Sequence, residues 1–407
     1  MDATMVLRSH DLVTLVTSFQ AGWYHEDLIL LPLFTGRFAV LRQVGVDGNA
    51  NLELGCGLLC TSDESLRRFD AVYRPWYKTH HEIHGVRRLL RCRDSCRYVL
   101  YIHACCFGYL GVVLELIATW PKLRNMPRYL DLSAWNGQLH VVEYLQEHQY
   151  DEFATTAVDW AARHGHLEIV KYLSGPLEPP EHCTAMAMDW AAEGGHFDVV
   201  TFLHNHRSEG CTTDAIDLAA QNGHLDIVTF LAAHRTEGCT TLAMDMAAQN
   251  GHFEVVQFLH NRFPDVGCTT DAIDLAAMHG HLIIVQFLRE NRQEGGTSDA
   301  LNWAAENGHV DVVKYLHQQG EDNSVVTVAM DGAIQAGQLE VVQYLFYFRL
   351  DPLNMWALAT ARERGHRHVL EWLHGALNPS IQQLSLAVPT DSLNASTMTV
   401  PPPSEAQ

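Results

Sequence analysis

Cysteine, aspartate and histidine occur together in the stretch EGCTTDAIDLAAQNGH, residues 209–224. These residue types build metal sites and catalytic triads: zinc is held by Cys and His side chains, and a triad needs a nucleophile, a His and an acid. The stretch therefore raises the question whether it forms a reactive site or belongs to the architecture. The answer depends on how the rest of the chain positions these residues.

The Gly-His pair that ends this stretch is part of a repeat with a period of 28 to 30 residues. Ten anchor glycines mark the copies: Gly108, Gly137, Gly165, Gly195, Gly223, Gly251, Gly280, Gly308, Gly337 and Gly365. Self-similarity at a fixed period of this length is the signature of a repeat architecture. Positions within each unit are therefore numbered from its anchor glycine.

Each unit predicts two short helices joined by a tight turn. A small residue at position −4, such as Ala219, and an aliphatic residue at position −7, such as Ile216, form one apolar stripe on a first helix. The anchor glycine suits the left-handed position that ends this helix. A second apolar stripe follows in HLDIVTFLAAHR, residues 224–235. The predicted N-caps of the first helices are Thr213, Thr241, Thr270 and Ser298.

The periodic Cys and His residues cannot converge on one metal ion. Equivalent positions in adjacent units lie about 8–10 Å apart, whereas zinc needs its ligands about 2.0–2.3 Å from one centre. Disulfides are excluded too, because bridged Cα atoms lie within about 7 Å. No nucleophile recurs beside Asp217 and His224, so we predict no catalytic residue, no metal and no cofactor. The residues concerned are Cys183, Cys211, Cys239, Cys268, His166, His196, His224, His252, His281 and His309.

Two clusters that precede the repeats leave a chemical interpretation open. Cys56, Cys60, Cys92 and Cys96 form two Cx3C pairs; we predict buried apolar side chains, with a zinc site as the alternative. The run RRLLRCRDSCR, residues 87–97, is rich in arginine. We interpret it as a solvated helix face that docks on the acidic repeats, and the alternatives are an anion site and a nuclear address.

Large apolar side chains recur at position −5, which points away from the buried positions −7, −4 and −3 at 100° per residue. They are Trp160, Trp190, Leu218, Met246, Leu275 and Trp303. An outward apolar stripe predicts a partner-binding groove. The alternative is packing against the loop of the adjacent unit. Position −2 varies freely and predicts adjustable specificity at Arg163, Glu193, Gln221, Gln249 and Glu306.

The charge is distributed unevenly. The 407 residues carry 27 Lys and Arg against 48 Asp and Glu, a formal net charge of −21, and residues 1–105 are close to neutral. The acidic remainder repels phosphate backbones, which argues against nucleic-acid binding. Ten cysteines are too few for a disulfide scaffold, and the sequence has no signal-peptide pattern and no stretch of 18 apolar residues. We therefore expect a monomeric, cytoplasmic protein with reduced thiols that binds no membrane, and we leave the nucleus open.

The stretch TTDAIDLAAQNGHLDIVTFL, residues 212–231, resembles the ankyrin repeat, whose pattern begins T-P-L-H-x-A-A and continues through G-H to V-V and a leucine pair. The resemblance covers residues 99–375. Ala215 and Asp217 stand at the positions of the family's Pro and His. The units are about five residues shorter than the family period near 33, and the loss falls where the ankyrin β-hairpin fingers lie. The resemblance thus implies an all-α, ankyrin-like α-solenoid with short turns in place of fingers.

These patterns predict three regions. Residues 1–97 form an irregular, mostly helical cap, in which residues 70–97 are a candidate degenerate repeat. Residues 98–376 form ten ankyrin-like repeats, and residues 377–407 a disordered Pro/Ser/Thr-rich tail. The resemblance implies a non-enzymatic protein–protein interaction scaffold that binds an unidentified protein along the first-helix face of an acidic array. The alternative is a target-recruiting adaptor or enzyme subunit whose activity lies in residues 1–100.

Overall fold

The computed structural model describes the part of the chain that holds the repeats. The described residues are 64–79, 83–92, 96–120, 129–148, 156–175, 183–320, 323–348 and 353–377. The predictions for Cys56 and Cys60, for the rest of residues 1–63 and for the tail from residue 378 lie outside them. The side chains of Cys92 and Cys96 also lie outside the described part.

Ten helix pairs follow one another in the described residues. Their first helices are α6 (Cys96–Phe107), α8 (Tyr129–Trp135), α10 (Ala157–Arg163), α12 (Ala185–Glu193), α14 (Asp214–Gln221), α16 (Thr241–Gln249), α18 (Asp271–Met278), α20 (Ser298–Glu306), α22 (Asn323–Ala336) and α24 (Met355–Glu363). Their second helices are α7 (Leu110–Thr119), α9 (Leu139–Glu147), α11 (Leu167–Leu173), α13 (Phe197–His206), α15 (Leu225–His234), α17 (Phe253–Arg262), α19 (Leu282–Asn291), α21 (Val310–Gln318), α23 (Leu339–Leu345) and α25 (Arg367–Leu377). Two further helices, α4 (Glu64–Thr79) and α5 (Ile83–Cys92), precede them.

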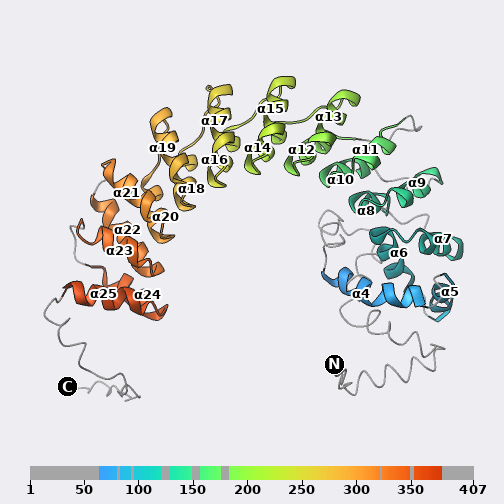
Figure 1. Ribbon diagram of the computed structural model, residues 1–407, viewed down its shortest axis with the longest axis horizontal. Helices are drawn as coiled ribbons and strands as arrows, with labels where there is room; N and C mark the ends of the chain where they lie inside the picture. Colours follow the sequence, from blue (N-terminus) through green and yellow to red (C-terminus); the bar gives the residue numbers. More distant parts are fainter. Residues whose placement is uncertain are drawn as a thin grey trace, which may run out of the picture. The chain divides into compact units, whose positions relative to one another are not determined.

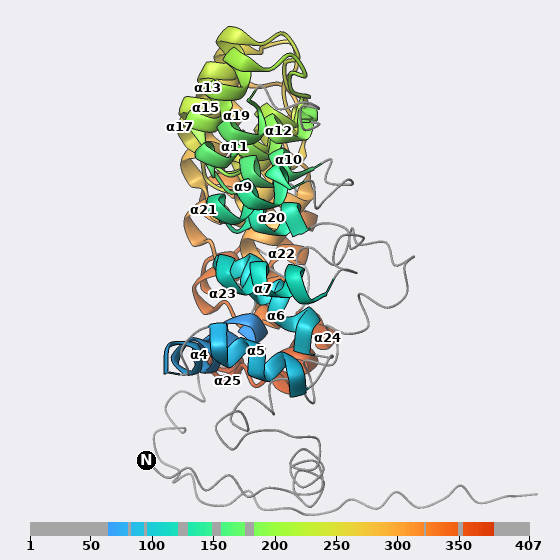
Figure 2. The same ribbon diagram turned by 90° about the vertical axis from the view of Figure 1, so that its right-hand side faces the viewer.

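The chain falls into two compact units, Met1–Thr269 and Thr270–Gln407. Within each unit, first helices pack against first helices and second helices against second helices. Figure 1 shows these two layers in the first unit, with α12, α14 and α16 in one and α13, α15 and α17 in the other. In the turned view, α13, α15 and α17 remain on the opposite side from α10 and α12 (Figure 2).

No strand occurs among the described residues, and residues 207–213, which connect α13 to α14, form no regular secondary structure. The predicted all-α, ankyrin-like solenoid with short turns in place of β-hairpin fingers is thus confirmed. Its core is built from small and branched residues. In the pair α14 and α15 the apolar side chains that are at most 2% exposed are Ala215, Ile216, Ala219, Ala220, Ile227, Val228 and Leu231. The alanines let neighbouring first helices approach closely, because their side chains take little space between the backbones.

In five first helices, α10, α12, α14, α16 and α18, a buried aspartate also binds the chain of the next pair. Asp217 in α14 is 6% exposed and accepts the backbone N–H of Thr240 at 2.9 Å and its hydroxyl at 2.6 Å. Burial raises the pKa of Asp217, and the hydrogen bonds from Thr240 oppose that rise. The same two hydrogen bonds join Asp159 to Thr184, Asp189 to Thr212, Asp245 to Thr269 and Asp274 to Thr297. We call this set the Asp–Thr ladder.

Three threonines of the ladder, Thr212, Thr240 and Thr297, also accept a capping hydrogen bond at the start of a first helix, each one residue before the predicted residue. Thr240 has extended backbone angles, φ −103° and ψ 178°, and its hydroxyl accepts the N–H of Leu242. Thr213 has helical angles, φ −60° and ψ −25°, and makes no capping hydrogen bond, while Thr212 beside it accepts the N–H of Asp214. An N-cap side chain must come from a non-helical residue. Thr213 and Thr270 lie at the predicted N-cap positions of α14 and α18, but their side chains make no capping hydrogen bond. Thr241 and Ser298 are the first residues of α16 and α20, whose N-caps are Thr240 and Thr297, so the prediction for these two is wrong.

Where a histidine follows the anchor glycine, it packs in most pairs on the anchor glycine of the preceding pair. Gly223 follows α14 with φ 78°, in the left-handed region that was predicted for it. A Cβ atom on Gly223 would lie 2.5 Å from Nδ1 of His252. The same close approach joins Gly165 to His196. The glycine thus serves two needs: it permits the turn, and it leaves room for the imidazole of the next pair.

We expect Asp217→Ala to lower the free energy of unfolding by about 1–3 kcal/mol, because it leaves two donors of Thr240 without their acceptor. Asp214→Ala, an exposed position on the same helix, should stay within about 0.5 kcal/mol of the wild type. Urea unfolding of both variants measures the difference. Equal losses would show that the ladder contributes no specific stability.

Gly223→Ala and Gly238→Ala should differ although both glycines have positive φ, 78° and 74°. A Cβ on Gly238 meets nothing within 4 Å, so only the backbone cost of about 1–2 kcal/mol applies there. At Gly223 the displaced His252 should add about 1–3 kcal/mol. Urea unfolding compares the two variants, and indistinguishable values would contradict the proposed glycine–histidine packing.

Candidate partner-binding surface

The residues predicted to form an outward apolar stripe lie on first helices, and all six are half-buried. Trp160, Trp190, Leu218 and Met246 belong to α10, α12, α14 and α16 of the first unit, and Leu275 and Trp303 belong to α18 and α20 of the second. Each side chain is therefore partly covered by its neighbours and partly open to solvent. The partner-binding groove stays a prediction.

Two of these tryptophans join a third that the sequence reasoning did not select. The ring centroids of Trp135 in α8 and Trp160 lie 4.3 Å apart, and those of Trp160 and Trp190 lie 4.8 Å apart. We call these three side chains the tryptophan row. Trp135 lies at position −2 rather than −5, so the periodic pattern did not find it. The available signal was a tryptophan in each of three successive first helices.

Polar groups surround this row. The guanidinium carbon of Arg163 lies 5.1 Å from the Trp190 ring centroid, within the range of a cation–π interaction. Arg163 also pairs with Glu193 at 3.2 Å, but both side chains are about one-third exposed, so the ion pair adds little stability. Its effect is to hold the guanidinium near the indole. The His164 ring lies 4.6 Å from Trp135, and burial lowers the pKa of His164 to about 4.

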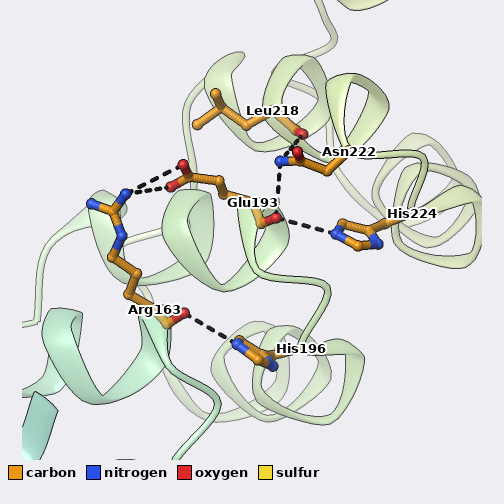
Figure 3. A network of polar contacts seen from close by, with 6 residues as sticks. All are labelled: Arg163, Glu193, His196, Leu218, Asn222 and His224. Atoms are coloured by element: carbon orange, nitrogen blue, oxygen red, sulfur yellow. Dashed lines mark hydrogen bonds and ion pairs between the residues drawn. The ribbon is translucent and has the colours of Figure 1, made fainter. Parts of the chain in front are cut away.

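The backbone beneath the variable position −2 is fixed by the next pair, as Figure 3 shows. The carbonyl of Arg163 accepts the Nε2–H of His196 at 3.1 Å. The carbonyl of Glu193 accepts the Nε2–H of His224 and the amide of Asn222, both at 3.1 Å. The Asn222 amide also donates to the carbonyl of Leu218. Histidines that looked like metal ligands in the sequence thus position the backbone of the candidate surface.

The remaining candidates at position −2 lie in equivalent places. Gln221 and Gln249 are half-buried, and Glu306 in the second unit is exposed. The carbonyl of Gln221 accepts the amide of Asn250 at 2.7 Å, and that of Glu306 accepts the amide of Gln338 at 3.1 Å. The side chain at this position can therefore change without loss of the hydrogen bond, because the bond uses the backbone carbonyl.

The periodic cysteines have no features of a reactive site. Cys183, Cys211 and Cys268 are buried free thiols, and Cys239 is half-buried. Burial raises the pKa of Cys183 and Cys239 to about 12 and that of Cys211 to about 11, so these thiols stay protonated near neutral pH. The described His, Cys, Asp and Glu residues contain no group of three that could hold a metal ion.

The arginine-rich run begins in α5, where Arg87 pairs with Glu115 of α7 at 2.9 Å. Arg87 is half exposed, whereas Glu115 is largely covered. One arginine of the run is thus used inside the chain, in contact with an acidic residue of the first helix pair. The side chains of Arg88, Arg91 and Arg93 lie outside the described part, so the anion-site alternative stays open for them.

A polar cluster lies buried between α4 and α6. The Nε2–H of His103 donates to Oδ1 of Asp70 at 3.0 Å. Arg74 lies 2.6 Å from Oδ2 of Asp70, and the Tyr109 hydroxyl donates to Oδ1 at 3.3 Å. Four aromatic rings lie with their centroids 4.7 to 5.3 Å from that of His103, namely Phe69, Tyr73, Phe107 and Tyr109.

An Asp–His pair is part of hydrolytic triads, but His103 is 0% exposed and Asp70 only 7%. An imidazole enclosed in this way cannot contact a substrate, so the pair is structural in this conformation. Burial lowers the pKa of His103 and outweighs the hydrogen bond and charge of Asp70, which raise it. Burial would raise the pKa of Asp70, but His103 and Arg74 prevail and hold it below its ordinary value.

We expect the first unit to lose stability as the pH falls below about 6.5, because His103 of the unfolded chain then binds a proton while native His103 does not. The loss continues until the pH reaches the lowered native pKa. His103→Phe removes this contribution, so the free energy of unfolding should fall less between about pH 7 and pH 5 than in the wild type. Urea unfolding at both pH values tests this, and parallel profiles would contradict it.

Comparisons with known proteins agree with this architecture. A sequence model described as ankyrin repeats (many copies) matches residues 188–232, and another described as ankyrin repeats (3 copies) matches residues 244–327. No curated protein matches the chain. None of the described helices is both long and apolar enough to cross a membrane. The matches agree with the stacked helix pairs and show that the chain contains ankyrin repeats.

Proposed function

We propose that this chain is a scaffold that binds a protein partner along the face formed by its first helices, with the tryptophan row as the anchor. Ankyrin repeats generally mediate protein–protein interactions and form a non-enzymatic interaction module. The observation that carries the finer proposal is the half-exposed contact of Trp135, Trp160 and Trp190 beside Arg163. Tryptophan and arginine are the residue types most enriched at the energetic centres of protein interfaces.

Preorganisation supports the same assignment. The aromatic contacts hold each indole against its neighbour, and the Arg163–Glu193 pair holds the guanidinium near Trp190. The carbonyls of Arg163 and Glu193 are fixed by His196 and His224 of the following pairs. A surface whose backbone and side chains are already ordered loses less conformational entropy when a partner binds.

The charge of the chain supports a basic partner. The formal net charge is −21, and the excess lies outside the first 105 residues. Opposite charge speeds the encounter and disfavours partners with acidic surfaces. In this proposal residues 98–376 are the binding array, and α4 and α5 cap its first helix pair, since α5 packs against α6 and α7.

The double substitution Trp160→Ala/Trp190→Ala should lower capture of the partner at least tenfold, which corresponds to a loss of about 1.4 kcal/mol in binding free energy. This lower limit is modest, since a single hot-spot residue contributes about 2 kcal/mol or more. Affinity capture with the full chain as bait, followed by quantitative mass spectrometry, measures the change. The matched control is Phe230→Ala, which removes a half-buried aromatic ring from the second-helix layer. The control should retain the captured proteins.

Thermal unfolding of the same variants separates binding from folding. Unchanged capture by the tryptophan variant together with a lowered melting temperature would contradict the proposal, because the tryptophan row would then stabilise the fold without contacting the partner. Equal loss of capture in the tryptophan variant and in Phe230→Ala would also contradict it, since the effect would not be confined to the first-helix face.

A further inference from the structure

The helices α4 and α5, which precede the repeats, belong to a basic stretch of a chain that is otherwise acidic. Residues 64–97 contain nine Lys and Arg against four Asp and Glu, a formal net charge of +5. Residues 106–407 contain 15 Lys and Arg against 37 Asp and Glu, a formal net charge of −22. The two parts thus differ in the sign of their charge, although α5 packs directly on α6 and α7 of the first repeat pair.

One face of α4 carries the exposed part of this charge. Arg67, Arg74 and Lys78 follow one another at intervals of seven and four residues, so they lie on the same side of the helix at 100° per residue. All three side chains are exposed. Asp70, which lies between them in the sequence, is only 7% exposed and is bound by His103. Every exposed charged side chain that the structure describes on α4 is therefore basic, and we call Arg67, Arg74 and Lys78 the basic stripe.

The cationic groups on these helices keep donors for a further anion. Arg74 lies 2.6 Å from Oδ2 of Asp70, yet its side chain is 52% exposed. Arg87 of α5 repeats this arrangement: its Nε lies 2.9 Å from Glu115, and its side chain is also 52% exposed. A guanidinium has five N–H donors in a planar fork, and two of them bind one carboxylate. Lys78 forms no hydrogen bond or ion pair with the residues that the structure describes.

The acidic helices beside α5 favour a short acidic peptide over a long polyanion. α5 packs on α7 and α7 on α9, and α9 contains Glu143 and Glu147 but no Lys or Arg. Packed helices lie about 8–10 Å apart, so a nucleic acid or an anionic membrane that covers α4 also reaches these carboxylates and is repelled by them. The basic stripe spans about 16 Å from Arg67 to Lys78, the length of about five extended residues. A segment of that size stays on the stripe.

We propose that the basic stripe binds an acidic segment of a partner protein, through contacts of its guanidinium and ammonium groups with carboxylates. Such charge-assisted hydrogen bonds are about twice as strong as neutral ones. α5 contains no acidic residue and adds to the positive potential around the stripe. The stripe lies on α4, apart from the tryptophan row on α8, α10 and α12, and its partner has the opposite charge to the basic partner proposed for the repeats. The two proposals are therefore independent.

The test uses the full-length protein and a fluorescein-labelled octaglutamate peptide, whose binding is measured by fluorescence anisotropy. The affinity should fall between about 50 mM and about 200 mM NaCl, because salt screens contacts between exposed charges. Lys78→Glu reverses the charge of an exposed side chain in the stripe and should weaken binding about tenfold. Lys78→Arg keeps the charge and should bind the peptide as the wild type does.

Lys171→Glu is the matched control. It makes the same charge reversal at an exposed lysine of α11, also in the first unit, so the net charge of the whole chain changes equally. The affinity for octaglutamate should stay within about twofold of the wild type, because this position lies outside the stripe. Thermal unfolding of both variants checks that they are folded.

Absence of octaglutamate binding by the wild-type protein would overturn the proposal, and so would an equal loss of affinity in Lys78→Glu and Lys171→Glu. Vesicles that contain phosphatidylserine and a double-stranded DNA test the other anions under the same salt conditions. Tighter binding of either one than of the peptide, with loss of that binding in Lys78→Glu, would assign the stripe to a membrane or to nucleic acid instead. We expect both to bind more weakly than octaglutamate.

Discussion

A buried carboxylate that accepts two hydrogen bonds from the next threonine is the interaction on which this repeat array depends. Without β-hairpin fingers, successive pairs have only their helix faces and a short connection to fix their arrangement. Asp217 binds the backbone N–H and the hydroxyl of Thr240, and the same hydroxyl caps α16. One side chain of one pair thus sets both the path of the connection and the start of the next helix.

The ladder also shows how its members depend on each other. A buried carboxylate is stable only with its donors, since a charge without partners is costly away from water. In α20 the aspartate is replaced by Asn302, and the residue at the corresponding threonine position is Val326. Both members change in the same place, so the array contains no buried carboxylate there without a hydroxyl to serve it. Asp331, which keeps its carboxylate, keeps a donor as well in Asn354.

The regular spacing of glycine and small residues was enough to predict the fold, because helix periodicity and a constant repeat length are properties of the sequence itself. The bonds between pairs were not predictable in the same way. Asp217 and Thr240 lie 23 residues apart, and Glu193 and His224 lie 31 apart. The periodic sequence pattern showed that these residue types recur, but it did not show which of them form hydrogen bonds with each other. Thr241 and Ser298 were predicted one position after the N-caps Thr240 and Thr297, and Trp135, outside the −5 series, was missed.

The hydrogen bonds that join successive helix pairs also explain why the candidate surface tolerates different side chains at position −2. At position −2 the neighbouring pair binds the backbone carbonyl, as His196 binds that of Arg163, so this hydrogen bond between pairs does not depend on which side chain stands there. At position −6 the side chain itself carries the bond, and aspartate recurs there. A repeat array can vary its binding specificity only at positions such as −2, where the bond between pairs uses the backbone and not the side chain. The charged and aromatic groups around Trp160 and Trp190 meet this condition, because their backbone is fixed while their side chains stay half exposed.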